Sequence, residues 1–157
     1  MKSLLKCTAA VLLTGMAITR PAVAAYVQVK MNHVPYGNVK IVIPVTAVNP
    51  KVWNVKLHNL MNAENAIKAG KGTLQARVVL YARGIAMLQQ PMAPPLAKLV
   101  DALRKDGVQF EICNNSLEKL QVDWHSLYGV KETDIVPSGF LEVGWLSNHG
   151  WAVDPLN

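Results

Sequence analysis

Apolar segments of strand length recur along the chain from residue 39 onward. Residues 39–43 and 76–82 are nearly continuous apolar sequence rich in β-branched side chains, which is typical of strands covered on both faces. Residues 108–113 begin with alternating apolar and polar side chains and also predict a strand. Shorter apolar runs predict two further strands at 133–136 and 151–153.

Helical periodicity fills the gaps between these strands. Residues 50–67 begin at an Asn-Pro pair, which fits an N-cap followed by proline in the first turn, and carry apolar side chains on one face. The next helix ends at Gly107, and its apolar positions are spaced i, i+3, i+4, i+7: Leu96, Leu99, Val100 and Leu103. Residues 140–148 form the last predicted helix, with Ser138 as its N-cap.

Strands and helices alternate throughout this part of the chain. The alternation predicts an α/β fold with three layers, in which a mainly parallel sheet of about five strands lies between two helical layers, as in flavodoxin-like proteins. No repeat or internal linker interrupts the pattern. We therefore expect one domain at residues 39–157, preceded by a lead-in at 25–38 that shows no clear period.

The first 24 residues have the features of a secretory signal peptide. Lys2 and Lys6 form a short basic start, residues 9–18 are mostly apolar, and residues 22–24 (Ala-Val-Ala) form an A-x-A cleavage site. The apolar run is about ten residues long, whereas a membrane-spanning helix needs about 20. Cleavage after Ala24 predicts a periplasmic or secreted protein that leaves the membrane.

Removal of this segment changes the charge and the cysteine count. The mature chain keeps 13 basic and all 10 acidic side chains, so its net charge is +3 rather than +6. This mild charge, without a basic stripe interleaved with aromatic residues, predicts no nucleic-acid partner. Cys7 is lost, so Cys113 has no partner for an intramolecular disulfide and is either a packed core thiol or a reactive one. Arg20, close to the cleavage site, leaves an uncleaved anchor as an alternative.

Cys113 stands where a predicted strand becomes a helix, and open α/β sheets carry functional groups at that edge. Asn115 and Glu118 fit a capping box for this helix. The free N–H groups and positive dipole end of a helix favour a thiolate over a thiol, and the thiolate attacks sulfur donors. Asn114 and Asn115 are candidates to bind a terminal sulfur anion. The alternative is a small apolar side chain packed in the core.

Several short motifs around this cysteine follow one another in a recognisable order: Gly107-Val108, Cys113, Ser116-Leu117, Val136-Pro137-Ser138-Gly139, Gly150-Trp151 and Pro155. Over about residues 39–155, these motifs and the order of elements resemble the DsrE/DsrF-like family of sulfur-relay proteins. The resemblance implies a small α/β protein that is often oligomeric. It also implies that Cys113 carries sulfur as a persulfide and passes it to a partner, and no cofactor is expected.

The histidines do not form a metal-binding motif. None of the four has another at metal-ligand spacing, and H-E-x-x-H is absent, so no metal site is predicted: His33, His58, His125 and His149. His125 lies downstream of the cysteine helix and is a candidate for activating the Cys113 thiolate as a nearby cation. Hydrogen bonding at the surface is the simpler interpretation of each histidine.

The sequence therefore predicts an exported DsrE-like protein that handles sulfane sulfur, with Cys113 as a persulfide carrier. Whether it acts as a sulfurtransferase enzyme or as a carrier stays open. Its expected partners are a sulfur donor or acceptor protein, a small sulfur compound, and copies of itself. One alternative is a non-catalytic binding or assembly module with a structural Cys113. Another is a metal or thiol-redox sensor that uses Cys113 and one histidine.

Overall fold

The computed structural model describes residues 26–30 and 35–155. The predicted signal peptide, residues 1–24, lies outside the described residues. The chain divides into two compact units, Met1–Asn32 and His33–Asn157, and the second carries all the described helices and strands. The described part of the predicted lead-in forms neither helix nor strand before residue 38.

The described strands form one five-stranded sheet in the order β4-β3-β2-β1-β5, and every pairing in it is parallel. The strands are β1 (Asn38–Val45), β2 (Thr73–Leu80), β3 (Gln109–Cys113), β4 (Ile135–Val136) and β5 (Ala152–Val153). β1 and β2 pair along their whole length, from Asn38 with Thr73 to Val45 with Leu80. The predicted parallel sheet is confirmed.

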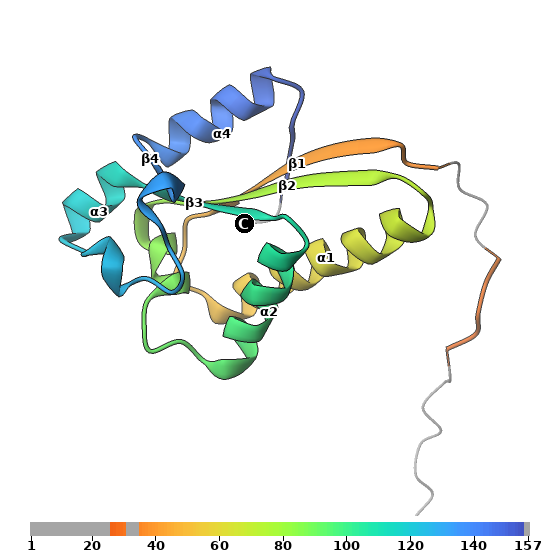
Figure 1. Cartoon of the computed structure of the whole chain (residues 1–157), viewed down its shortest axis with the longest axis horizontal. Helices are drawn as coiled ribbons and strands as arrows, with labels where there is room; N and C mark the ends of the chain where they lie inside the picture. The colour runs from red at the N-terminus through yellow and green to blue at the C-terminus, as the bar shows by residue number, and fades with distance from the viewer. Residues whose placement is uncertain (1–25, 31–34, 156–157) are drawn as a thin grey trace, which may run out of the picture. The chain divides into compact units, whose positions relative to one another are not determined.

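The helices complete three layers. They are α1 (Pro50–Ala69), α2 (Pro94–Lys105), α3 (Asn114–Leu120) and α4 (Gly139–Asn148), with short 3₁₀ helices η1 (Ala82–Leu88), η2 (Trp124–Ser126) and η3 (Glu132–Asp134). Figure 1 shows α1 and α2 on one face of the sheet and α4 on the other. Because β1 to β4 follow one another across the sheet and β5 lies beyond β1, α4 carries the chain back over the opposite face.

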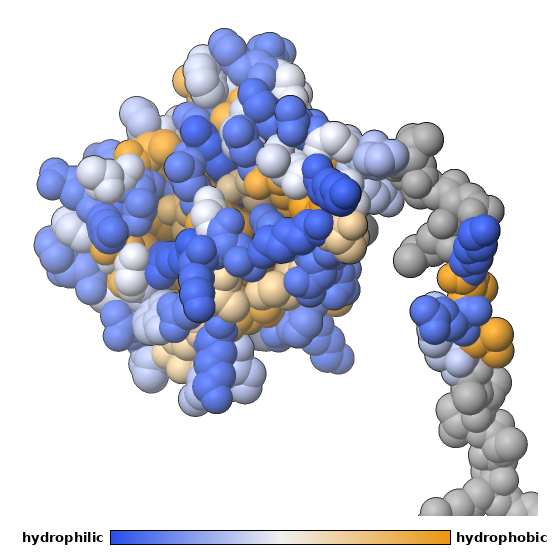
Figure 2. All heavy atoms as spheres, turned by 45° about the vertical axis from the view of Figure 1, so that its right-hand side comes forward, coloured by the Kyte–Doolittle hydropathy of each residue, from blue (hydrophilic) through white to orange (hydrophobic). Residues whose placement is uncertain are grey.

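Both faces of the central strands are buried, which explains their nearly continuous apolar sequence. Val78 and Leu80 of β2 belong to the large core under α1 and α2. Val79, between them, packs on the other face with Val42 and with Leu146 of α4. On the outside, hydrophilic residues cover most of the face seen in Figure 2.

Local signals set the predicted helix starts. The Asn49 side chain accepts hydrogen bonds from the backbone N–H groups of Lys51 and Val52, at 3.1 and 3.4 Å, and Pro50 occupies the first turn. Ser138 caps α4 in the same way through the N–H of Leu141. Both predicted N-caps are confirmed, and each satisfies a helix N–H that has no partner within the helix.

Several predicted boundaries are wrong. The strand expected at 76–82 begins at Thr73 and ends at Leu80, and Ala82 begins η1 instead. The capping box expected at Asn115 is absent, because α3 begins two residues earlier than predicted, with Cys113 at the N-cap position and no side-chain cap. The strand expected at 133–136 keeps only its last two residues. The residues before them form η3 instead, where the Asp134 carboxylate accepts a hydrogen bond from the backbone N–H of Lys131, at 2.9 Å.

An ion pair ties the last strand of the sheet to the first helix. The Nζ atom of Lys56, a buried residue of α1, lies 2.7 Å from the Oδ2 atom of Asp154, which directly follows β5. The backbone N–H of Asp154 donates to the carbonyl of Val42 in β1, at 2.9 Å. β5 itself pairs with β1 at only two positions, so these side-chain and backbone contacts help to hold the C-terminal segment on the sheet.

A second charged cluster lies between the sheet and α4. Arg77 of β2 donates from Nη1 to Glu111 of β3, at 2.9 Å, and to Glu142 of α4, at 3.4 Å. Its guanidinium also lies 5.1 Å from the ring centroid of Trp151. Burial raises the pKa of the Glu111 carboxyl, and Glu142 adds to the rise while Arg77 opposes it. Asp134 also raises the pKa of Glu111.

This raised pKa gives a testable pH dependence. The folded protein binds the Glu111 proton more tightly than the unfolded chain does, so its contribution makes stability fall as pH rises above the ordinary value of 4.5. We expect Glu111→Gln to make this fall shallower. Urea denaturation between about pH 4.5 and 7 measures the free energy of unfolding, and Glu118→Gln, at an exposed position on α3, is the control. Identical slopes for wild type and Glu111→Gln would contradict this assignment.

Candidate functional site

Cys113 ends β3 at the carboxyl edge of the parallel sheet. It is a free cysteine with 4% of its surface exposed. β3 pairs in parallel with β2, so the residues that follow β2 come to the same edge. There Cys113 lines a pocket of about 510 Å³, together with side chains from the segment after β2, from α3 and from the start of α4. Cys113 therefore lies at the carboxyl edge of the sheet, as the sequence predicted, and lines a pocket large enough for a small molecule.

The segment after β2 is held in place by α3. Ala82 adopts a left-handed backbone conformation (φ +49°), which costs a non-glycine residue about 1–3 kcal/mol. Its N–H donates to the Oγ atom of the buried Ser116, at 2.7 Å. Arg83 follows directly and lines the pocket. The hydrogen bond to Ser116 thus fixes the backbone from which Arg83 extends.

The start of α4 forms the opposite wall and packs very closely. A Cβ atom on Gly139 would lie 2.7 Å from the Cβ of Tyr81 and 3.1 Å from the Cβ of Cys113, so only glycine fits without a shift. The next residue, Phe140, meets the Tyr81 ring edge-on at a centroid distance of 6.5 Å. Burial raises the pKa of the Tyr81 hydroxyl, and Cys113 adds to the rise. The phenol therefore keeps its proton and remains a hydrogen-bond donor.

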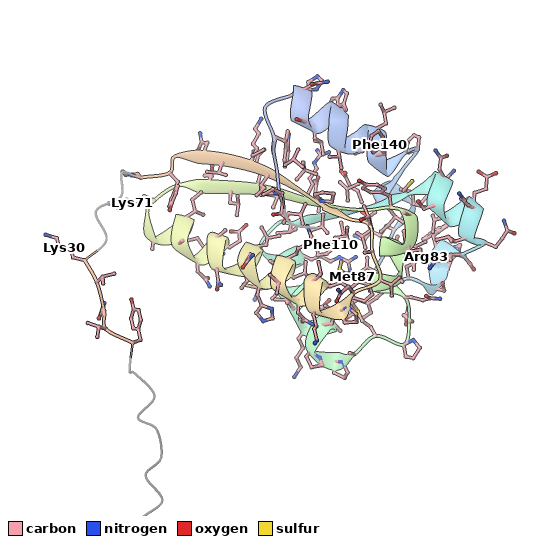
Figure 3. The ribbon with its side chains drawn as sticks, turned by 180° about the vertical axis from the view of Figure 1, so that it is seen from behind. Lys30, Lys71, Arg83, Met87, Phe110 and Phe140 are labelled. Atoms are coloured by element: carbon pink, nitrogen blue, oxygen red, sulfur yellow. The ribbon has the colours of Figure 1, made fainter. Side chains whose placement is uncertain are left out.

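Basic side chains give the pocket its charge. Arg83 and Lys119 line it, and no Asp or Glu is among the lining residues that the structure describes. Figure 3 places Arg83 and Phe140 at the same end of the sheet, with Lys71 at the other. Sequence reasoning missed both basic residues. Two signals were available: Arg83 comes just after a buried strand, and Lys119 is four residues after Asn115, on the same helix face.

The two predicted asparagines have different surroundings. Asn115 lines the Cys113 pocket. Its backbone N–H, however, donates to the carbonyl of Pro137, at 3.4 Å, so the side-chain amide is the group it presents to a ligand. Asn114 is exposed and lines a separate surface pocket that includes Glu118 and Asp123. The structure therefore brings one of the two asparagines to the cysteine pocket.

His125 is not among the residues that line the Cys113 pocket. It lies in η2, where its Nδ1 atom is 2.7 Å from the Oδ1 atom of Asp123 and its ring stacks on Trp124 at 3.8 Å. The backbone and side-chain hydrogen bonds from His125 lower the pKa of the Asp123 carboxyl. Local hydrogen bonding at the surface accounts for this histidine. Within residues 26–30 and 35–155, no three His, Cys, Asp or Glu side chains gather as a metal-ligand set.

The close packing of Gly139 predicts a specific loss of stability. We expect Gly139→Ala to lower the free energy of unfolding by about 1–3 kcal/mol, because the new methyl group must push α4 away from Tyr81 and Cys113. Gly144→Ala is the control on the same helix, since its Cβ would meet nothing within 4 Å and alanine favours a helix. Urea denaturation measures both variants. Equal free energies of unfolding for Gly139→Ala and Gly144→Ala would contradict the prediction, because the space around Gly139 would then accommodate a methyl group.

Comparison with known proteins extends only to the fold. No protein-family model matches the chain, and no curated protein is similar in sequence. Among solved structures, the chain is similar to a protein of unknown function, MTH1491 from Methanobacterium thermoautotrophicum, with a TM-score of 0.64 and 22% sequence identity. The match covers 74% of this chain and 97% of that protein. At this identity the likeness shows a shared three-layer α/β fold.

Proposed function

We propose that this protein is an exported sulfane-sulfur carrier of the DsrE type, in which Cys113 accepts sulfur as a persulfide and passes it on. The observation that carries the proposal is the position of Cys113. It is a free thiol at the carboxyl edge of a parallel sheet, and it lines a pocket that also holds two basic side chains, Arg83 and Lys119. Basic side chains in the same pocket are suited to hold an anionic sulfur compound beside this thiol.

The transfer consists of two thiol exchange steps. The Cys113 thiolate attacks the outer sulfur of a donor, a new S–S bond forms, and the donor's remaining group leaves with the electron pair of the broken bond. An acceptor thiolate then attacks the outer persulfide sulfur, and Cys113 leaves as a thiolate. The side-chain amide of Asn115 and the hydroxyl of Tyr81, both lining the pocket, are suited to donate hydrogen bonds to the terminal sulfur.

The small exposed fraction of Cys113, 4%, also favours a carrier. Oxidation of sulfur groups follows their accessibility, so a persulfide in this position is protected between the two steps. The same burial favours a second candidate function, a binding or assembly module in which Cys113 is only a packed core side chain. The reactivity of the thiol separates the two.

Two further parts of the proposal concern location and partners. We infer export to the periplasm or the medium from the signal-like sequence of residues 1–24. As a separate finding, no helix among the described residues is both long and apolar enough to cross a bilayer. Self-association is supported by α4, which exposes large apolar side chains beside the pocket: Phe140 (75%), Leu141 (69%) and Trp145 (50%). Donor and acceptor are a small sulfur compound or a protein thiol.

Intact-mass spectrometry tests the carrier function. After incubation of the mature protein with inorganic polysulfide, we expect a gain of one or more sulfur atoms that dithiothreitol removes, and no gain in Cys113→Ser. The variant is also the control for loading elsewhere, since Cys113 is the only cysteine after residue 24. No adduct, together with resistance of the thiol to iodoacetamide until the protein is unfolded, would favour the binding module instead.

Light scattering tests self-association through α4. We expect the mature protein at high micromolar concentration to be larger than a monomer, and Leu141→Ser to lower its mass because an exposed apolar contact is lost. Val55→Ser removes a side chain of similar exposure (53%) from α1, on the other face of the sheet, and is the control. A monomeric wild-type protein would exclude this part of the proposal.

A further inference from the structure

We propose that the Cys113 pocket takes a small inorganic sulfur oxyanion with a sulfane sulfur at one end, the class to which thiosulfate belongs, and that Arg83 and Lys119 bind its charged end. This inference rests on the proposed role of Cys113 as a sulfur acceptor and names the donor for that role. It assigns binding functions to two residues that sequence motifs did not indicate.

The two ends of the pocket differ in chemistry. At the inner end, Cys113 is almost completely buried and presents a soft, polarisable sulfur. At the outer end, Arg83 and Lys119 are exposed and present hydrogen-bond donors with positive charge. A ligand that satisfies both ends has a sulfur atom that a thiolate can attack and an oxyanion group that cations can bind.

The charges around the pocket favour an anion over a neutral donor. No carboxylate is among its described lining residues. The acidic residues that are closest in sequence to the pocket residues of α3 and α4 have other neighbours. Glu118 lines the neighbouring pocket with Asn114, and Glu142, on α4, is paired with Arg77. The two basic side chains at the rim are therefore not neutralised by an acid in the same pocket, and they raise the local concentration of small anions.

Size and depth favour a small molecule over a protein as the donor. The pocket, about 510 Å³, is in the usual range for small-molecule sites. With 4% of Cys113 exposed, a thiol on the surface of a protein reaches the sulfur only if its loop enters the recess or α4 moves. A small oxyanion needs neither.

Both basic residues extend from fixed backbone. Arg83 follows Ala82, whose left-handed conformation is held by the 2.7 Å hydrogen bond to Ser116. Lys119 lies one turn after Asn115 and on the same face of α3, so the amide and the ammonium face one ligand together. This fixed placement reduces the entropic cost of binding an anion between them.

The reaction with thiosulfate is balanced without a further reactant. The Cys113 thiolate attacks the outer sulfur, a new S–S bond forms, and the sulfur–sulfur bond of thiosulfate breaks. Sulfite leaves with the bonding electron pair, and Cys113 carries a persulfide anion. The total charge is the same on both sides, and no external oxidant, reductant or proton is needed.

The test compares loading rates of Cys113 by thiosulfate and by inorganic polysulfide, followed by intact mass. We expect thiosulfate loading to fall roughly threefold in Arg83→Gln or Lys119→Gln and roughly tenfold in the double variant, as for exposed ionic contacts. Arg83→Lys should retain most of the rate. Raised ionic strength should slow loading of the wild type, and sulfate should compete. Lys98→Gln, an exposed lysine of α2, is the control and should leave the rate unchanged.

Three results would overturn parts of the inference, and they are distinguishable. If polysulfide loads Cys113 but thiosulfate does not, the donor assignment fails and the carrier function stands. If thiosulfate loads the double variant at the wild-type rate, the binding role of Arg83 and Lys119 fails and the carrier function stands. If neither donor loads Cys113 in the wild type, the carrier function fails and the donor assignment fails with it. Equal urea midpoints for all variants exclude misfolding as the cause of a slower rate.

Discussion

The need to cover both faces of a parallel sheet determines the rest of this structure. β1 and β2 are apolar on both faces. A single helical layer made of α1 and α2 would therefore leave half of their side chains exposed to water. The chain meets this constraint with α4, which crosses the opposite face and buries Val42 and Val79 under Leu146. To begin that crossing, the chain must pass over the carboxyl edge of β3, directly against Cys113. The pocket at the cysteine is thus formed by the same segment that completes the core.

Two contacts of different kinds hold α4 in this position. At its start, Gly139 permits the backbone to approach Tyr81 and Cys113 more closely than any side chain allows. Further along, Glu142 shares the Arg77 guanidinium with Glu111 of the sheet. The first is a steric fit, whereas the second joins charged side chains, one of which, Glu111, is buried and has a raised pKa. Protonation of Glu111 at low pH relieves the cost of burying its charge but weakens its attraction to Arg77, so the two effects oppose each other.

Much of the fold and only part of the site followed from sequence. Strands and helix caps depend on neighbouring residues, so the caps at Asn49 and Ser138 and the alternation of elements were predictable. In sequence Glu111 is only a polar position of an alternating strand, and nothing local indicates that it is buried and paired with Arg77. Arg83 and Lys119 share a pocket with Cys113 because β2 and α3 end at one sheet edge, a juxtaposition that no local pattern contains. His125 comes after the cysteine helix in sequence, but in the structure it contacts Asp123 and Trp124 and does not line the Cys113 pocket.

The pairing of β5 with β1 has a consequence for how the chain reaches its folded state. Ile41 and Val42 meet Ala152 and Val153, so the first strand acquires its second neighbour only when nearly the whole chain has been synthesised. The Lys56–Asp154 ion pair forms equally late. Contacts of such long sequence separation slow folding. Until β5 has been synthesised, the edge of β1 that faces away from β2 therefore has no strand to pair with, and such an unpaired edge can pair with another chain.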